Sequence, residues 1–171
     1  TINLPFTFPF YGTNYTQVTL DTNGIVYPGV RTAYAFANQV LPNSVSGSPA
    51  ALIAGFWDDL FVNSLAEFRF HSIDATTFVV LYDNVKAFSS SNRITFQIVF
   101  RADGQIAVQY QDNQFTRSYT IGLQNPARTL GPQVAYSDSG SGTIQGLQLP
   151  VGTGINRAIS FYPPANFVTG F

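Results

Sequence analysis

Residues 93–101 read RITFQIVFR, and the alternation of their side chains decides the fold class. Large apolar residues occupy every second position from Ile94 onward, and most of the positions between them are polar. A period of two is typical of a β-strand that buries one face and exposes the other. Asp103-Gly104 then forms a turn sequence, because this dipeptide tolerates positive φ, and residues 105–111 (QIAVQYQ) alternate again. The stretch predicts an antiparallel β-hairpin.

Hairpin patterns recur along the chain. One pivots at Asn23-Gly24, and another turns near Asp74 into an apolar run at residues 78–82, which predicts a central strand covered on both faces. The best candidate for a helix is residues 32–40, TAYAFANQV, which Pro42 would stop. About 11 short strands with Gly, Pro and Asn turns predict an all-β, antiparallel β-sandwich with one short helix at most. Because no linker interrupts the pattern, we expect a single β-sandwich domain over residues 1–171.

The composition excludes several classes of partner. The 171 residues include eight Lys or Arg and nine Asp or Glu, so that 10% are charged and the formal net charge is −1. Soluble domains typically have about 25% charged residues. Nucleic acids and anionic lipids require clustered Lys and Arg, and the longest apolar run, residues 50–57, is far too short to span a membrane. We therefore expect no nucleic-acid partner and no membrane insertion.

The sulfur content bears on location. The chain contains no cysteine and no methionine. A domain of this length can be stable without disulfides, and the absence of oxidisable sulfur suits an exposed, oxidising environment. We therefore expect an extracellular location at the cell surface. Asn14-Tyr15-Thr16 is a sequon for N-glycosylation, which matters only in a glycosylating host.

The strands and turns carry an ordered series of motifs. In chain order these are FPFYG (8–12), LDTNG (20–24), IAGFWDD (53–59), FVVLYDNV (78–85), ITFQIVF (94–100), ADG (102–104) and IGLQN (121–125). The series resembles the NIDO-type domain, the extracellular module of nidogen that also occurs in many secreted and cell-surface proteins, bacterial ones included. The resemblance covers about residues 6–136 and leaves the C-terminal strands and tail, residues 137–171, outside it. It implies a matrix, adhesion or surface-display module, without catalytic residues to carry over.

The side chains themselves offer little for catalysis. His71 is the single histidine, and its neighbours alternate so that it falls on the polar face of a predicted strand. A Ser-His-Asp triad would have to use this residue, no cysteine can act as a nucleophile, and a zinc site needs three or four His or Cys ligands. We therefore expect a non-enzymatic protein.

An acidic pair suggests the one candidate metal site. Asp58-Asp59 is the only adjacent pair of carboxylates, and it follows Trp57 at the end of an apolar run. Calcium is bound by several oxygen ligands, so Asp58, Asp59 and Asp83 form a candidate calcium site. Apart from calcium we expect no cofactor. The alternative is that one carboxylate accepts hydrogen bonds from turn amides and the other faces water. A glycosidase pair of Asp58 and Asp83 would need a defined separation that nothing in the sequence shows.

Aromatic residues suggest an alternative function, a carbohydrate-binding adhesin. Trp57 ends a segment that has the pattern of a buried strand, and we interpret it as a core residue. Tyr15, Tyr27 and Tyr34 lie in the nearly uncharged first third of the chain. They are the candidate ligand-binding residues, with a glycan as the ligand.

Both ends of the chain are apolar and nearly free of charge. Pro5 and Pro9 remove amide donors from the alternating N-terminal segment and predict an edge strand or a polyproline-like run, not a central strand. The ends either pack on their own domain, or one of them completes a neighbouring subunit by strand addition and builds a fibre. The candidate self-association residues are Ile2, Leu4, Phe6, Phe8, Phe167 and Phe171.

These observations predict a secreted, non-enzymatic structural or adhesive protein of the cell surface. We favour a self-assembling extracellular filament subunit packed through its apolar termini, because a neutral surface lowers the repulsion and desolvation costs of close packing. Its expected partners are copies of itself or other surface proteins, and glycans in the alternative function.

Overall fold

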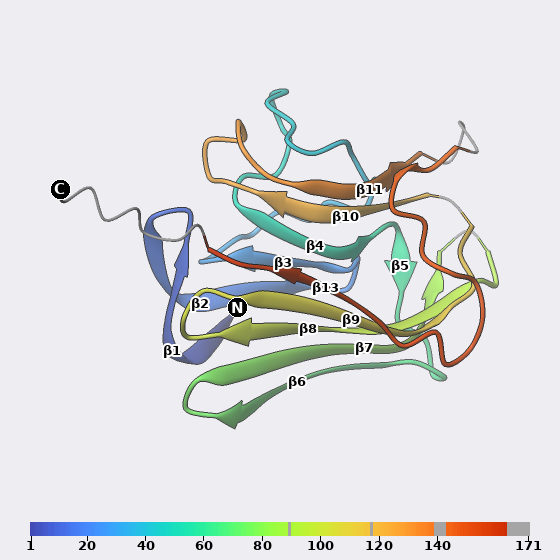
Figure 1. The fold of residues 1–171 in the computed structure, drawn as a ribbon, viewed down its shortest axis with the longest axis horizontal. Helices are drawn as coiled ribbons and strands as arrows, with labels where there is room; N and C mark the ends of the chain where they lie inside the picture. The colour runs from blue at the N-terminus through green and yellow to red at the C-terminus, as the bar shows by residue number, and fades with distance from the viewer. Residues whose placement is uncertain (89, 117, 139–142, 164–171) are drawn as a thin grey trace, which may run out of the picture.

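The computed structural model describes residues 1–171 apart from 89, 117, 139–142 and 164–171. Two antiparallel sheets pack against each other in a β-sandwich, which confirms the predicted fold class (Figure 1). The residues that the structure describes form 13 strands, against the expected 11 or so, and two of these strands are only two residues long. The described residues include no helix, and hence none that could span a membrane.

The two sheets differ in strand order. Sheet A has the order β1-β2-β3-β4-β10-β11-β12, and sheet B has the order β13-β9-β8-β7-β5, with β6 also paired to β7. The strands of sheet A are β1 (Ile2–Phe10), β2 (Thr13–Asp21), β3 (Ile25–Pro28), β4 (Leu52–Trp57), β10 (Tyr119–Gln124), β11 (Gln133–Ser137) and β12 (Gln145–Gly146). Those of sheet B are β5 (Leu60–Phe61), β6 (Glu67–Asp74), β7 (Thr77–Ala87), β8 (Arg93–Arg101), β9 (Ile106–Asn113) and β13 (Arg157–Phe161). Most neighbouring strands follow each other in the chain and form antiparallel pairs. The pairs β4–β10 and β9–β13, in contrast, join distant parts of the chain.

The β8–β9 hairpin forms as predicted. Gly104 adopts a φ of 89° in the turn, and the Asp103 carboxylate accepts a hydrogen bond from the Gln105 backbone amide at 2.9 Å. The inward-facing residues pair across the two strands as Phe96 with Tyr110, Ile98 with Val108 and Phe100 with Ile106. All six are at most 2% exposed. The predicted hairpins at Asn23-Gly24 and near Asp74 are also present, as β2–β3 and β6–β7.

Strand β4 is buried on both faces. Ile53 and Phe56 belong to the main core between the sheets. On its opposite face, Leu52, Ala54 and Trp57 form a second, smaller cluster. The other members of that cluster are Ile25, Tyr27 and Leu41, with Ala35 packed against it.

The segment that covers this second cluster corrects the prediction of a helix at residues 32–40. The segment is not helical. Its polar groups bond to sheet A instead: the Trp57 indole donates to the Ala35 carbonyl at 2.8 Å, and the Thr120 hydroxyl donates to the Gln39 carbonyl at 2.8 Å. The Asn38 side chain donates to the Ser137 carbonyl at 2.7 Å. These tertiary hydrogen bonds pair two backbone carbonyls and one side chain of the segment with sheet A, and they outweigh a weak local helix preference.

Strand β7 is central, as predicted, but only one of its faces is covered. Phe78, Val80 and Tyr82 are at most 1% exposed and face sheet A. Val79 and Leu81 point to the other side and are only half-buried. The outer face of sheet B therefore remains open to solvent, and this face carries one of the two grooves described below.

Candidate functional site

The two carboxylates of the acidic pair, Asp58 and Asp59, are both shielded in part from solvent. Asp58 is buried at the end of β4, and its carboxylate accepts a hydrogen bond from the Ser118 hydroxyl at 3.0 Å. Its backbone amide donates to the Asn23 carbonyl. Burial raises the pKa of Asp58 to about 6, because the ionised carboxylate loses its hydration. Burial also raises the pKa of Asp59, which is half-buried.

Asp83, the third candidate calcium ligand, lies apart from this pair. It is on the outer side of β7 in sheet B, where its carboxylate accepts a hydrogen bond from the Thr95 hydroxyl at 3.1 Å. Asp58 follows β4 in sheet A. Among the described residues, no three His, Cys, Asp or Glu side chains come close enough together to hold a metal ion. The structure therefore corrects the candidate calcium site: Asp58, Asp59 and Asp83 do not form one ligand set.

The three candidate tyrosines do not form a common platform. Tyr27 is 2% exposed inside the second cluster, so its prediction as a surface residue is wrong. Its hydroxyl donates to the Asp21 carboxylate at 3.4 Å, and the Arg31 guanidinium lies over its ring. Tyr15 is half-buried against the main core, whereas Tyr34 is 86% exposed. Only Tyr34 of the three presents its ring fully to solvent.

The single histidine and the single tryptophan of the chain lie where their sequence patterns predict. His71 is exposed on β6, which agrees with its prediction on the polar face of a strand. Trp57 is 0% exposed, which confirms that it is a core residue. Neither side chain is therefore placed to act in a cleft.

The N-terminal candidate residues for self-association pack on their own domain. β1 is the edge strand of sheet A, as its prolines predict. Leu4 and Phe8 are in the main core, and Ile2 and Phe6 pack against it. The Phe8 ring makes an edge contact with that of Phe100, 5.3 Å between centroids. Association through these side chains would require β1 to leave its sheet. The C-terminal candidates, Phe167 and Phe171, lie outside the described residues.

An apolar groove lies at one end of the sandwich, and we call it the end groove. Its volume is about 740 Å³, and none of the described residues that line it is charged. It lies where the β1–β2 and β8–β9 turns and the β10–β11 connection meet the end of β13, on the left in Figure 1. Its most deeply buried apolar lining residues are Phe10, Ile106, Leu123 and Phe161, and its rim includes Tyr11, Leu130, Tyr162 and Pro163.

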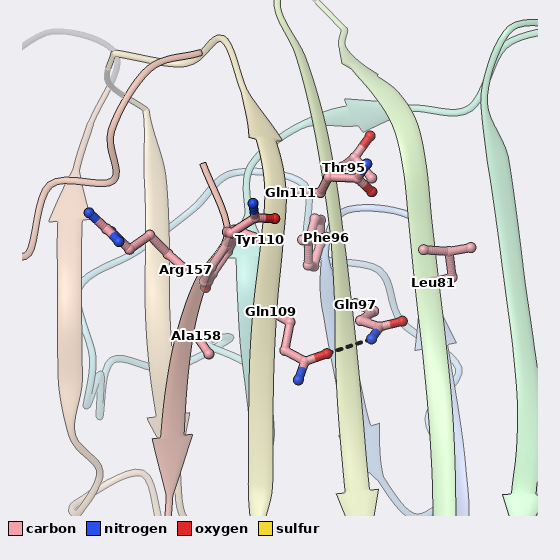
Figure 2. A pocket seen from close by; sticks show the side chains of 10 residues that line it. Leu81, Thr95, Phe96, Gln97, Gln109, Tyr110, Gln111, Arg157 and Ala158 are labelled. Atoms are coloured by element: carbon pink, nitrogen blue, oxygen red, sulfur yellow. Dashed lines mark hydrogen bonds between the residues drawn. The ribbon is translucent and has the colours of Figure 1, made fainter. Parts of the chain in front are cut away.

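A second groove, the amide groove, lies on the outer face of sheet B and has a volume of about 390 Å³. Figure 2 shows the side chains of Gln97 and Gln109 side by side on neighbouring strands. The Gln97 amide donates to the Gln109 carbonyl oxygen at 2.5 Å. The other lining residues are Leu81, Thr95, Phe96, Tyr110, Gln111, Asn156, Arg157 and Ala158. Among the described lining residues, Arg157 alone is charged.

Neither groove is evident from local sequence patterns. The polar face of the β8–β9 hairpin can be read from the alternation, and it includes Gln97, Gln109 and Gln111. What the alternation does not show is that β13, some 50 residues further on, pairs with β9 and places Ala158 opposite Gln109. The groove depends on this long-range pairing.

Comparison with known proteins identifies one match. The family model described as NIDO related matches residues 1–160. This range is wider than the residues 6–136 that carry the resemblance, and it includes β11, β12 and most of β13. No curated protein and no solved structure matches the chain.

Proposed function

This chain belongs to the NIDO-related family, and on that premise we propose that it is a secreted, non-enzymatic structural or adhesive protein of the cell surface. The family suggests an extracellular type of domain. Self-assembly into a filament is the form of this function that we favour. A carbohydrate-binding adhesin is the alternative.

The environments of the reactive side chains support a non-enzymatic role. His71 is exposed on β6, away from both grooves. The Asp58 carboxylate is buried and bonded to Ser118 at the end of β4. Neither groove contains a carboxylate among the described residues that line it. General acid–base catalysis needs a titratable group within reach of a bound substrate, and these grooves do not offer a carboxylate or imidazole for it.

The end groove is the observation that carries self-assembly. Buried apolar surface is the main driving force of stable association, and this groove is apolar and lined by uncharged residues. The chain continues from its rim at Pro163 into a segment that contains Phe167 and Phe171. In the assembly that we favour, this segment occupies the end groove of a neighbouring copy, because its two phenylalanines supply apolar surface to an uncharged lining.

This contact would be heterologous, because the segment of one copy occupies the groove of the next. Contacts of this type generate rings where the rotation closes and open filaments where it does not. Phe167 and Phe171 of one copy would supply apolar side chains to the end groove of its neighbour. The N-terminal residues Ile2, Leu4, Phe6 and Phe8 would contribute indirectly, since they hold β1 in the sheet that borders the groove.

Size-exclusion chromatography with light scattering, together with electron microscopy, tests the proposal. The unmodified protein should assemble as its concentration rises. Leu130→Asp places a charge in the groove and should give a monomer, and so should the double variant Phe167→Asp/Phe171→Asp. A mixture of these two variants should give a dimer, because one intact segment meets one intact groove. Leu65→Asp is the matched control, since Leu65 is exposed to 67% and Leu130 to 61%, and it should still assemble. A compact monomer of the unmodified protein at all concentrations would contradict self-assembly.

The alternative function loses most of its original support. A sugar platform built on Tyr15, Tyr27 and Tyr34 would need exposed rings that lie together, and Tyr27 is buried. The amide groove offers a different surface for such a ligand.

A further inference from the structure

The amide groove is built on one row of side chains that crosses sheet B. Leu81 on β7 is paired in register with Gln97 on β8, Gln97 with Gln109 on β9, and Gln109 with Ala158 on β13. Residues that are paired in register project to the same face of a sheet. The row therefore places two amides between two apolar side chains on the open face of the sheet, as Figure 2 shows.

The amides of this groove have hydrogen-bonding capacity to spare. An uncharged glutamine side chain offers two donors and an acceptor. Gln97 and Gln109 share a single hydrogen bond, which leaves the Gln97 carbonyl oxygen and both Gln109 amide hydrogens available. The Gln111 side chain forms no hydrogen bond within the part of the chain that the structure describes, and it is exposed.

Other glutamines of the same protein are used differently. The buried Gln124 side chain donates to the Pro49 carbonyl at 2.6 Å and accepts from the Asn43 backbone amide. The Gln133 side chain accepts from the Leu41 backbone amide at 2.8 Å. These amides fasten loops to sheet A. Those of the groove fasten no loop, so their clustering has no comparable structural purpose.

The chemistry of the groove indicates the class of ligand. Amides donate to and accept from hydroxyl groups, while Leu81 and Ala158 offer apolar surface to C–H groups. Arg157 is the one charged residue among the described residues that line the groove, and Figure 2 shows its guanidinium turned away from the amide pair. An anionic ligand would need cationic groups directed at it. A volume of about 390 Å³ lies within the range of small-ligand sites.

We propose that the amide groove binds a neutral oligosaccharide, with Gln97, Gln109 and Gln111 as the hydrogen-bonding residues. The sugar hydroxyls would bond to the free amide groups, and one apolar face of a sugar ring would lie on Leu81 or Ala158. The site deepens the adhesive part of the proposed function and does not depend on self-assembly, since it shares no residue with the end groove.

A glycan array that carries both neutral and sialylated oligosaccharides tests the proposal, followed by calorimetry with the neutral sugar that gives the strongest signal. We expect binding to neutral glycans, and the double variant Gln97→Ala/Gln109→Ala should weaken it at least about tenfold, since each lost hydrogen bond is worth about 1 kcal/mol. Gln17→Ala is the matched control. Gln17 also donates to an amide on the adjacent strand, that of Asn3 at 2.7 Å, but on sheet A, and this variant should bind as the unmodified protein does.

The outcomes separate this site from the filament proposal. No binding to any neutral glycan, or binding that the double variant leaves unchanged, would overturn the site. Binding restricted to sialylated glycans would overturn the neutral class of ligand. Light scattering of the same double variant should show that it assembles as the unmodified protein does. Self-assembly and sugar binding are thus tested by separate measurements, and either can fail without the other. Thermal unfolding of the double variant should match that of the unmodified protein, because Gln109 is exposed and Gln97 half-buried.

Discussion

The Tyr110 hydroxyl in sheet B donates a 2.6 Å hydrogen bond to the backbone carbonyl of Gly55 in sheet A. Both groups lie in the core, where Tyr110 is 2% exposed. The bond joins the β8–β9 hairpin to the centre of β4, the strand that is buried on both faces. A buried carbonyl that loses its partner cannot recover the loss from water.

Tyr110→Phe keeps the ring and removes the hydroxyl, so it should lower the free energy of unfolding by about 1 to 3 kcal/mol, the cost of leaving a buried polar group unpaired. Chemical denaturation with urea measures the change. Tyr34→Phe, which removes an exposed hydroxyl, should stay within about 0.5 kcal/mol of the unmodified protein. Equal stabilities for Tyr110→Phe and the unmodified protein would show that the bond contributes nothing.

Gly55 also sets the distance between the sheets. A Cβ at this position would lie 2.7 Å from the Ile98 Cδ1 and 2.9 Å from a ring carbon of Phe96. Gly55→Ala should therefore destabilise the protein by about 1 to 3 kcal/mol through overpacking. Ile98→Ala removes both clashing carbons of Ile98, Cδ1 and the Cγ1 at 2.8 Å, and by itself should cost about 2 to 5 kcal/mol. The double variant should lose less free energy of unfolding than the two single variants lose together. Strictly additive losses would argue against the contact.

Asp58 predicts a dependence of stability on pH. Its pKa in the folded protein is raised to about 6 from the model-peptide value of 3.8, so the folded state binds more protons between these two values than the unfolded state does. The free energy of unfolding should therefore fall as pH rises from 4 to above 6, by about 2 to 3 kcal/mol.

Asp58→Asn tests this dependence, because asparagine can still accept the Ser118 hydrogen bond but does not ionise. The variant should lose the fall in stability between pH 4 and 6.5, as measured by urea unfolding at a series of pH values. Asp59→Asn should have a smaller effect on how the free energy of unfolding depends on pH, since Asp59 is less buried than Asp58. An unchanged profile in Asp58→Asn would contradict the assignment.

Removal of calcium should not affect the protein. Asp58 and Asp59 follow a strand of sheet A, Asp83 lies on sheet B, and the described residues gather no three metal-ligating side chains. We therefore expect the same Tm, by calorimetry, in excess EDTA and in millimolar calcium. A Tm that is several degrees higher in calcium than in EDTA would contradict the separation of these carboxylates and would indicate that they form one site.

Local patterns predicted the elements that depend on neighbouring residues. The alternation of residues 93–101 and the Asp103-Gly104 turn are sufficient for the β8–β9 hairpin, because both strands and their turn lie within about 20 residues. Pro5 and Pro9 likewise excluded a central strand and left an edge strand or a polyproline-like run, since a residue without an amide hydrogen cannot pair on both sides. The apolar content of residues 50–57 predicted that Trp57 is buried.

Predictions that depended on distant partners were less successful. The pattern of residues 32–40 allowed a helix, but Trp57, Thr120 and Ser137 offer these residues other hydrogen bonds. Tyr27 was interpreted as a surface residue because its charge-poor surroundings in the chain do not reveal that Leu41 and Ala35 cover it. Asp58 and Asp83 carry compatible side chains for calcium, yet the described residues bring no three such ligands together.

By itself, the sequence determined the fold class, the main hairpins and the membership of a family of extracellular type, because a period of two, turn dipeptides and ordered motifs are all local properties of the chain. Tertiary structure alone decided where functional surfaces could lie. The pairing of β13 with β9 places Ala158 beside Gln109 and completes the amide groove, and the meeting of three turns with the end of β13 forms the end groove. The physical reason is that strand register and sheet packing join residues far apart in the chain, and no local pattern specifies which strands become neighbours.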